Sequence, residues 1–212
     1  MQGSSIAALG SSALVALCGA AYAALLWSIA AAVARERRLG LGALPVWLPA
    51  AGGAAAASVA AFFAADVALP IAAALIGTLV CGLVDARTGL IFDALTLAMS
   101  AATGAADALD HRLVDGLTAA LIVGGALAAI YFVTGRRGIG LGDVKLGAAL
   151  ALGLGSEAGL VALGGAFVLG ALYAAVMIGT GRAKRSDAIR FGPFIAGGAA
   201  LSLSAVTLGF HL

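Results

Sequence analysis

The sequence of 212 residues has few charged side chains, because Asp, Glu, Lys and Arg together make up only 10% of it. A water-soluble domain is about one quarter charged, so this chain lacks the charge needed to cover a surface in water. Hydrophobic residues make up 63% of the sequence, and its mean hydropathy is +1.12. The composition therefore excludes a soluble globule and predicts an all-α, polytopic helical membrane protein.

Aromatic residues are also scarce, at 6%, whereas the sequence holds 55 Ala and 31 Gly. Small residues let helices approach closely in lipid, where close packing replaces the hydrophobic effect as the source of helix association. We therefore expect closely packed helices with membrane lipid around them.

Cysteines are limited to Cys18 and Cys81, each inside an apolar run. Neither belongs to a CxxC pair or to a Cys/His spacing suited to zinc, so we interpret both as packing residues and expect no metal and no other cofactor. The net charge is only +2, and no basic run is interleaved with aromatic residues, which excludes a nucleic-acid partner. The N-terminus has no basic segment before its apolar run, which favours a first spanning helix over a cleaved signal.

Eight apolar segments follow one another along the chain, and about 20 such residues suffice to cross a bilayer. They cover residues 6–33, 46–65, 67–84, 91–109, 116–134, 144–158, 159–180 and 191–210. The weakest is 144–158, which is short and rich in Gly, and the join at 65–67 requires a tight turn. We expect about eight transmembrane helices, with residues 1–66 as an N-terminal pair and residues 67–212 as a second unit.

The basic residues divide unequally between the two sets of loops. If both termini lie outside, 11 of the 12 basic residues are cytoplasmic, namely Arg35, Arg37, Arg38, Arg87, Arg136, Arg137, Lys145, Arg182, Lys184, Arg185 and Arg190. Only Arg112 then lies outside, together with the acids Asp66, Asp107, Asp110, Asp115 and Glu157. Cytoplasmic loops of membrane proteins are enriched in Lys and Arg, so this imbalance supports both the span count and the orientation.

Two cytoplasmic acids stand where an apolar run meets the interface. Asp85 ends the third run, and Asp143 directly precedes the sixth. Both should therefore lie at the same depth, and they can meet if these two helices pack together. Gly140 and Gly142 favour a close approach of another chain beside Asp143. Two adjacent carboxylates share one proton, so one can activate water while its partner donates to a peptide carbonyl.

A simpler structural role is also open for each acid. A single Asp at a membrane interface is commonly a helix cap or a contact to a lipid headgroup, and a GxGD pattern is weak in a chain with 31 Gly. From composition and spacing alone, these alternatives outweigh an aspartyl catalytic site.

Three ordered segments resemble the bacterial type IV prepilin peptidases, which are membrane-embedded aspartic proteases of the GxGD class. The first is D85-ARTGLIF-D93, the second is G140-L-G-D143-V-K145, and the third is R190-FGPFIAGGA. Their order and spacing match the family over roughly residues 72–205, or about two thirds of the chain. The resemblance implies that residues 67–212 form a catalytic membrane domain.

By this resemblance Asp85 and Asp143 are the catalytic pair of an aspartic endopeptidase. The same resemblance implies hydrolysis of the leader of a prepilin or pseudopilin at the cytoplasmic face of the bacterial inner membrane, in a type IV pilus or type II secretion system. Supporting roles fall on Gly140, Gly142, Asp93, Lys145, Gly192 and Pro193. Asp93 is equally well interpreted as the N-cap of the fourth span, with its oxygen on the N–H of Leu95 or Thr96. Lys145 is equally well interpreted as extending toward lipid headgroups, and Gly192 and Pro193 as shaping a helix entrance.

The chain departs from the family pattern in two ways. Phe92 replaces the Pro of an Ile-Pro-Asp triplet, which removes a backbone constraint before the fourth helix. The paired CxxC motifs of longer members are missing, so we expect peptidase activity without N-methylation. Two other functions stay open: a small proton- or cation-coupled transporter, and a non-catalytic component of a pilus or secretion assembly.

Overall fold

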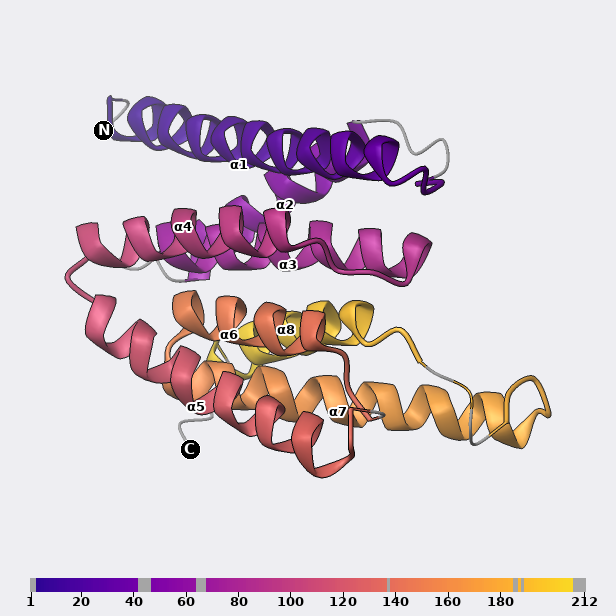
Figure 1. The fold of residues 1–212 in the computed structure, drawn as a ribbon. Coiled ribbons are helices and arrows are strands. Elements are labelled where there is room, and N and C mark those ends of the chain that lie inside the picture. Colours follow the sequence, from indigo (N-terminus) through magenta and orange to yellow (C-terminus); the bar gives the residue numbers. More distant parts are fainter. Residues whose placement is uncertain are drawn as a thin grey trace.

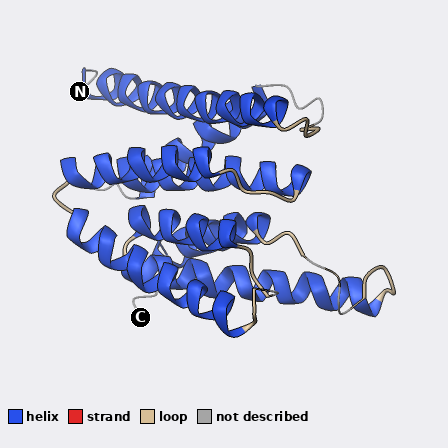
Figure 2. Cartoon of the chain, in the orientation of Figure 1, coloured by secondary structure: helices blue, strands red, loops and turns tan. Residues whose placement is uncertain are grey.

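The computed structural model describes residues 3–41, 47–63, 68–136, 138–184, 187 and 189–207. Within these ranges the chain forms eight α-helices and no strand (Figures 1 and 2). Asp66, Arg137, Arg185 and the join at 65–67, all used in the sequence predictions, lie outside the described residues. The all-helical prediction is confirmed.

Each helix coincides with one of the predicted apolar segments. The helices are α1 (Gly3–Glu36), α2 (Trp47–Phe63), α3 (Ala68–Thr88), α4 (Asp93–Leu109), α5 (Leu113–Val133), α6 (Leu141–Leu154), α7 (Ser156–Gly179) and α8 (Gly192–Thr207). The predicted boundary between the sixth and seventh segments, at 158/159, is wrong. The break is at Gly155, whose backbone leaves the helical region with φ +82° and ψ 177°.

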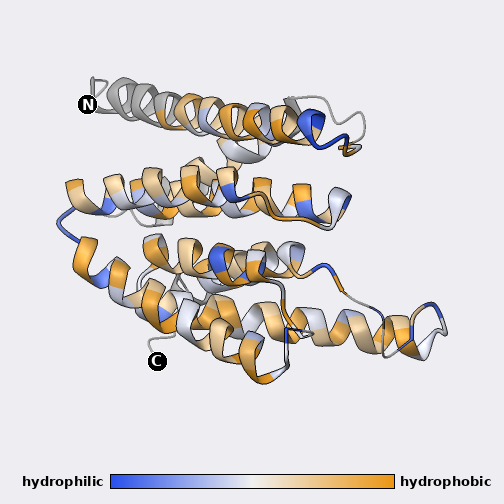
Figure 3. Cartoon of the chain, viewed as in Figure 1, coloured by the Kyte–Doolittle hydropathy of each residue, from blue (hydrophilic) through white to orange (hydrophobic). Residues whose placement is uncertain are grey.

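Four helices are long and apolar enough to cross a membrane, over Val15–Glu36, Leu69–Thr88, Leu113–Val133 and Ser156–Gly179. The even-numbered helices are shorter, and the 14 residues of α6 extend only about 21 Å at 1.5 Å per residue. Apolar residues line the lengths of the helices, whereas hydrophilic residues gather near helix ends and in the connecting turns (Figure 3). The chain is therefore a polytopic membrane protein, and the crossing of all eight helices stays a prediction.

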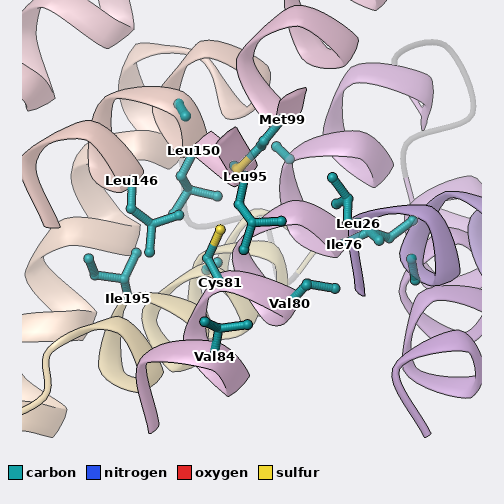
Figure 4. Packing of buried hydrophobic residues seen from close by; sticks show 14 of the residues in the cluster. Leu26, Ile76, Val80, Cys81, Val84, Leu95, Met99, Leu146, Leu150 and Ile195 are labelled. Carbon is teal, nitrogen blue, oxygen red and sulfur yellow. The ribbon is translucent and has the colours of Figure 1, made fainter. Parts of the chain in front are cut away.

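Helix α3 occupies the centre of the molecule. In its apolar window 67% of the residues are buried, compared with 28% or fewer in the other three long helices. Helices α1, α2, α4, α6 and α8 all pack against it. Figure 4 shows the resulting core, which includes Leu26, Ile76, Val80, Leu95, Leu146 and Ile195. A polar side chain on the inner face of α3 is consequently surrounded by other helices.

Small residues allow the close helix approach that the composition predicts. Helices α7 and α8 meet at Gly198, where an added Cβ would overlap the backbone of Ala162 and Ala166. Because lipid gives helices no hydrophobic reason to associate, this close van der Waals contact is a main source of their stability.

Candidate active site

Asp85 lies near the C-terminal end of α3 and is only 5% exposed. Its Oδ2 atom accepts a hydrogen bond from the backbone N–H of Gly192, at 3.0 Å. The helix ends one turn later, where Gly89 adopts a φ of +69° and its N–H donates to the carbonyl of Asp85. The carboxylate is therefore held in one position by a segment 107 residues further along the chain.

Gly192 begins α8 directly against this carboxylate. A Cβ at position 192 would lie 2.9 Å from both the Cβ and the Oδ2 of Asp85, so a larger residue cannot occupy it without displacing the carboxylate. The free N–H groups at a helix N-terminus also stabilise a nearby negative charge. Pro193 follows in the first turn of α8, as expected for residues that shape a helix entrance near the site.

Arg190 is a neighbour of Asp85 that the sequence analysis counts only as a basic loop residue. Its guanidinium donates to the carbonyl of Ala86 and exerts an electrostatic attraction on the Asp85 carboxylate. Its position directly before the FGPF stretch is the one sequence signal that could have indicated this contact.

Asp143 lies in the first turn of α6, outside the four long apolar helices. Its Oδ2 atom accepts a hydrogen bond from the backbone N–H of Gly140, at 3.1 Å, which is the reciprocal half of a capping box. Gly142 brings this turn against the α3–α4 connection, because an added Cβ there would lie 2.9 Å from the Cβ of Ile91. Asp143 therefore caps its helix, as the structural interpretation predicts. Its other carboxylate oxygen takes no part in this hydrogen bond.

The structure brings Asp85 and Asp143 to the same junction, because α3 packs against α6. The pKa of Asp143 is raised to about 6, chiefly by burial and also by the negative charge of Asp85, while the hydrogen bond from Gly140 acts in the opposite direction. Two carboxylates that sense each other in a partly buried site can share a proton at near-neutral pH. This arrangement is suited to general acid–base chemistry with water.

Asp93 and Lys145 form an ion pair that the sequence analysis did not anticipate. Lys145 Nζ donates to Asp93 Oδ1 at 2.7 Å, which joins the start of α4 to α6. The N-cap interpretation of Asp93 is wrong, since Phe92 is the N-cap and makes no side-chain cap bond. The N–H groups of Leu95 and Thr96 donate to the Phe92 carbonyl instead. Lys145 therefore has a protein partner at the membrane interface.

Within the described ranges, no three His, Cys, Asp or Glu side chains lie close enough together to hold a metal ion. The two cysteines are free thiols, with Cys18 exposed and Cys81 buried. The groups that the structure gathers around this junction are carboxylates, an amine, a guanidinium and backbone N–H groups.

Comparisons with known proteins agree with the sequence resemblance. Residues 72–175 match the type IV leader peptidase family. Prepilin leader peptidase/N-methyltransferases from two strains of Burkholderia pseudomallei, 1026b and K96243, are each 34% identical over 126 residues, or 57% of this chain. The chain spans 41% of the length of these relatives. No solved structure matches it.

Proposed function

We propose, from the match of residues 72–175 to the type IV leader peptidase family, that the protein is a membrane-embedded aspartic endopeptidase for prepilins or pseudopilins. Residues 67–212 form its catalytic domain, and the N-terminal pair of helices packs against α3. The chain acts at the cytoplasmic face of the bacterial inner membrane, where the basic loops place the ends of α3 and α6.

The observation that supports this proposal is that α3 and α6 pack together with the charge of Asp85 acting on Asp143, while Gly192 holds the first carboxylate. The ionised carboxylate takes a proton from a water molecule while the oxygen of that water attacks the scissile carbonyl carbon. The protonated partner donates to the carbonyl oxygen, and the tetrahedral intermediate then collapses as the leaving amine takes up a proton. No covalent acyl-enzyme forms in this sequence.

The proposed substrate carries a short basic leader, a Gly before the cut and an apolar helix after it. Such a chain lies in the bilayer with its cleavage site at the cytoplasmic interface, which is the depth of both carboxylates. The inner carboxylates and anionic lipid offset the repulsion between the leader and the basic loops.

Purified protein incubated with a Gly-ending basic leader fused to an apolar helix tests this function through the size of the product. We expect Asp85→Asn and Asp143→Asn each to lower the cleavage rate at least about 100-fold, the loss typical of a removed general acid or base. Glu157→Gln is the matched control. Glu157 is an exposed acid in the first turn of α7, which follows the end of α6 remote from Asp143. Full cleavage by either Asp variant would overturn the assignment of the pair.

A further inference from the structure

The two carboxylates of the proposed catalytic pair differ in their charged neighbours. The guanidinium of Arg190 donates a hydrogen bond to the carbonyl of Ala86, the residue directly after Asp85. From this position it attracts the Asp85 carboxylate electrostatically. A cation beside one carboxylate of a pair favours the ionised form of that carboxylate over the ionised form of its partner.

The side chain of Arg190 is fixed in place at the end of α3. A Cβ at position 89 would lie 3.5 Å from its Nε atom, so the side chain packs over the backbone of Gly89. Two residues after Arg190, the N–H of Gly192 donates to Asp85 Oδ2 at 3.0 Å. The segment that leads into α8 therefore brings both a cation and a backbone donor to Asp85, and each of them stabilises a negative charge there.

Asp143 has no comparable cation among the residues that the structure describes. Its Oδ2 atom accepts a hydrogen bond from the backbone N–H of Gly140, which carries no charge. Lys145, the only base on α6, pairs with Asp93 at 2.7 Å. Burial is the chief cause of the raised pKa of Asp143, and the neighbouring charge that acts on it is the negative charge of Asp85. The surroundings of Asp143 therefore favour its protonated form.

The other ionisable groups near this end of α3 do not remove the difference. Arg87 donates to the carbonyl of Leu41, and Arg37 of α1 lies over the ring of Phe92. Cys81, one turn before Asp85, is a buried free thiol. Helices α2 and α8 also pack against α3, but neither carries an ionisable side chain other than those of masked positions. The remaining charged residues at the end of α1 are exposed, namely Arg35, Glu36 and Arg38.

We propose that Arg190 is a positioning residue that keeps Asp85 ionised, so that Asp85 is the general base and Asp143 carries the shared proton. This inference rests on the proposed peptidase function and assigns one role to each acid. Asp85 takes a proton from the attacking water, and Asp143 donates its proton to the carbonyl oxygen of the substrate. When the C–N bond breaks, the leaving amine takes the proton from Asp85, and a hydroxyl group of the intermediate returns a proton to Asp143.

The pH dependence of cleavage tests the role of Arg190. Cleavage slows on the acid side when the base becomes protonated, and Arg190→Gln removes the cation that opposes this protonation. We expect the acid limb of kcat/KM to move to higher pH by about 0.5–1 unit, since a close opposite charge has a larger effect and Arg190 is exposed to solvent. An unchanged acid limb, or a shift of the basic limb alone, would overturn the proposal.

Two further variants separate the charge of Arg190 from its structural contacts. Arg190→Lys keeps the positive charge, so its acid limb should stay close to that of the wild type. Arg182→Gln is the matched control, because Arg182 is an exposed base in the same connection and its N–H donates to Met177 of α7. Its pH profile should not change. A shift in either variant equal to that of Arg190→Gln would contradict the role of the Arg190 charge.

Infrared spectroscopy locates the proton without a substrate. At about pH 5, below the pKa of Asp143, the difference spectrum between wild type and Asp143→Asn should contain the C=O stretch of a protonated carboxyl group. The difference spectrum between wild type and Asp85→Asn should contain the stretches of a carboxylate. The reverse assignment of these bands would overturn the proposal.

The two proposals can fail separately. If the wild type cleaves the substrate but Arg190→Gln keeps its pH profile, the peptidase function stands and the role of Arg190 falls. If the wild type cleaves nothing, the peptidase function falls, and the infrared spectra still decide which acid carries the proton.

Discussion

At the scale of single residues, Phe92 shows how packing can replace a missing backbone constraint. Its φ of −78° lies within the range that a Pro at this position would impose. Its ring is 2% exposed, and the Arg37 guanidinium lies 5.9 Å from the ring centroid. The turn therefore keeps a backbone conformation that Pro would adopt, with a buried aromatic ring in place of the Pro constraint.

Asp143 should make the stability of the protein depend on pH between about 4 and 6. Its pKa is about 6 in the fold, against an ordinary value of 3.8, so the folded state binds the proton more tightly than the unfolded state does. Stability from this group is present below about pH 4 and is lost as the pH rises through 6. The melting temperature of detergent-solubilised wild type should show this loss, and Asp143→Asn should lack that part of it. An identical pH dependence in both proteins would contradict the prediction.

The positions of Asp85 and Asp143 could be predicted because each acid terminates or precedes an apolar run, which is a local signal. The partners of the site could not be predicted in the same way. The Lys145–Asp93 pair joins residues 52 positions apart, and the Arg190–Ala86 contact joins residues 104 positions apart. Both depend on which helices pack together, and periodicity in one sequence carries no information about that packing.

At the scale of helices, the apolar runs predict the elements well because each run is bounded by charges or by turn residues. The boundary between α6 and α7 is the exception, since residues 150–165 are apolar and rich in Gly apart from Ser156 and Glu157, which directly follow the break. The break depends on the conformation of Gly155 alone. With φ +82° and ψ 177°, it occupies a region that is essentially restricted to Gly.

Gly155→Ala should therefore destabilise the protein. The backbone strain costs about 1–3 kcal/mol, and the new Cβ would lie 2.9 Å from Asp115 Oδ2. We expect the melting temperature to fall by at least about 2–4 °C, the usual shift for 1 kcal/mol in a chain of this size.

Gly164→Ala is the matched control for that substitution. Gly164 lies on α7 with no atom within 4 Å of an added Cβ, and Ala is favoured over Gly inside a helix by about 1 kcal/mol. Its melting temperature should be unchanged or higher. A loss of stability in Gly164→Ala equal to that in Gly155→Ala would contradict the conformational explanation.

At the scale of the whole molecule, the charge distribution orients the bundle in the membrane. The α1–α2, α5–α6 and α7–α8 connections carry eight of the 12 basic residues, whereas the α4–α5 turn carries Arg112 alone. This asymmetry predicts that the proposed catalytic junction faces the cytoplasm.

Cysteine labelling on intact cells tests the orientation. In a Cys18→Ser background, in which Cys81 is buried, a membrane-impermeant maleimide should label His111→Cys in the α4–α5 turn and should not label Thr180→Cys at the end of α7. Both positions should be labelled after the cells are opened. Labelling of Thr180→Cys alone on intact cells would invert the predicted topology.

The hydrogen bond from Gly192 to Asp85 has a consequence for biosynthesis. The ribosome makes the carboxylate 107 residues before the N–H group that holds it, and it makes α8 after the other seven described helices. A nascent chain whose α8 is still inside the ribosome therefore carries both proposed catalytic acids without their final arrangement. Proteolytic competence would then arise only after α8 has been made and has packed against α3.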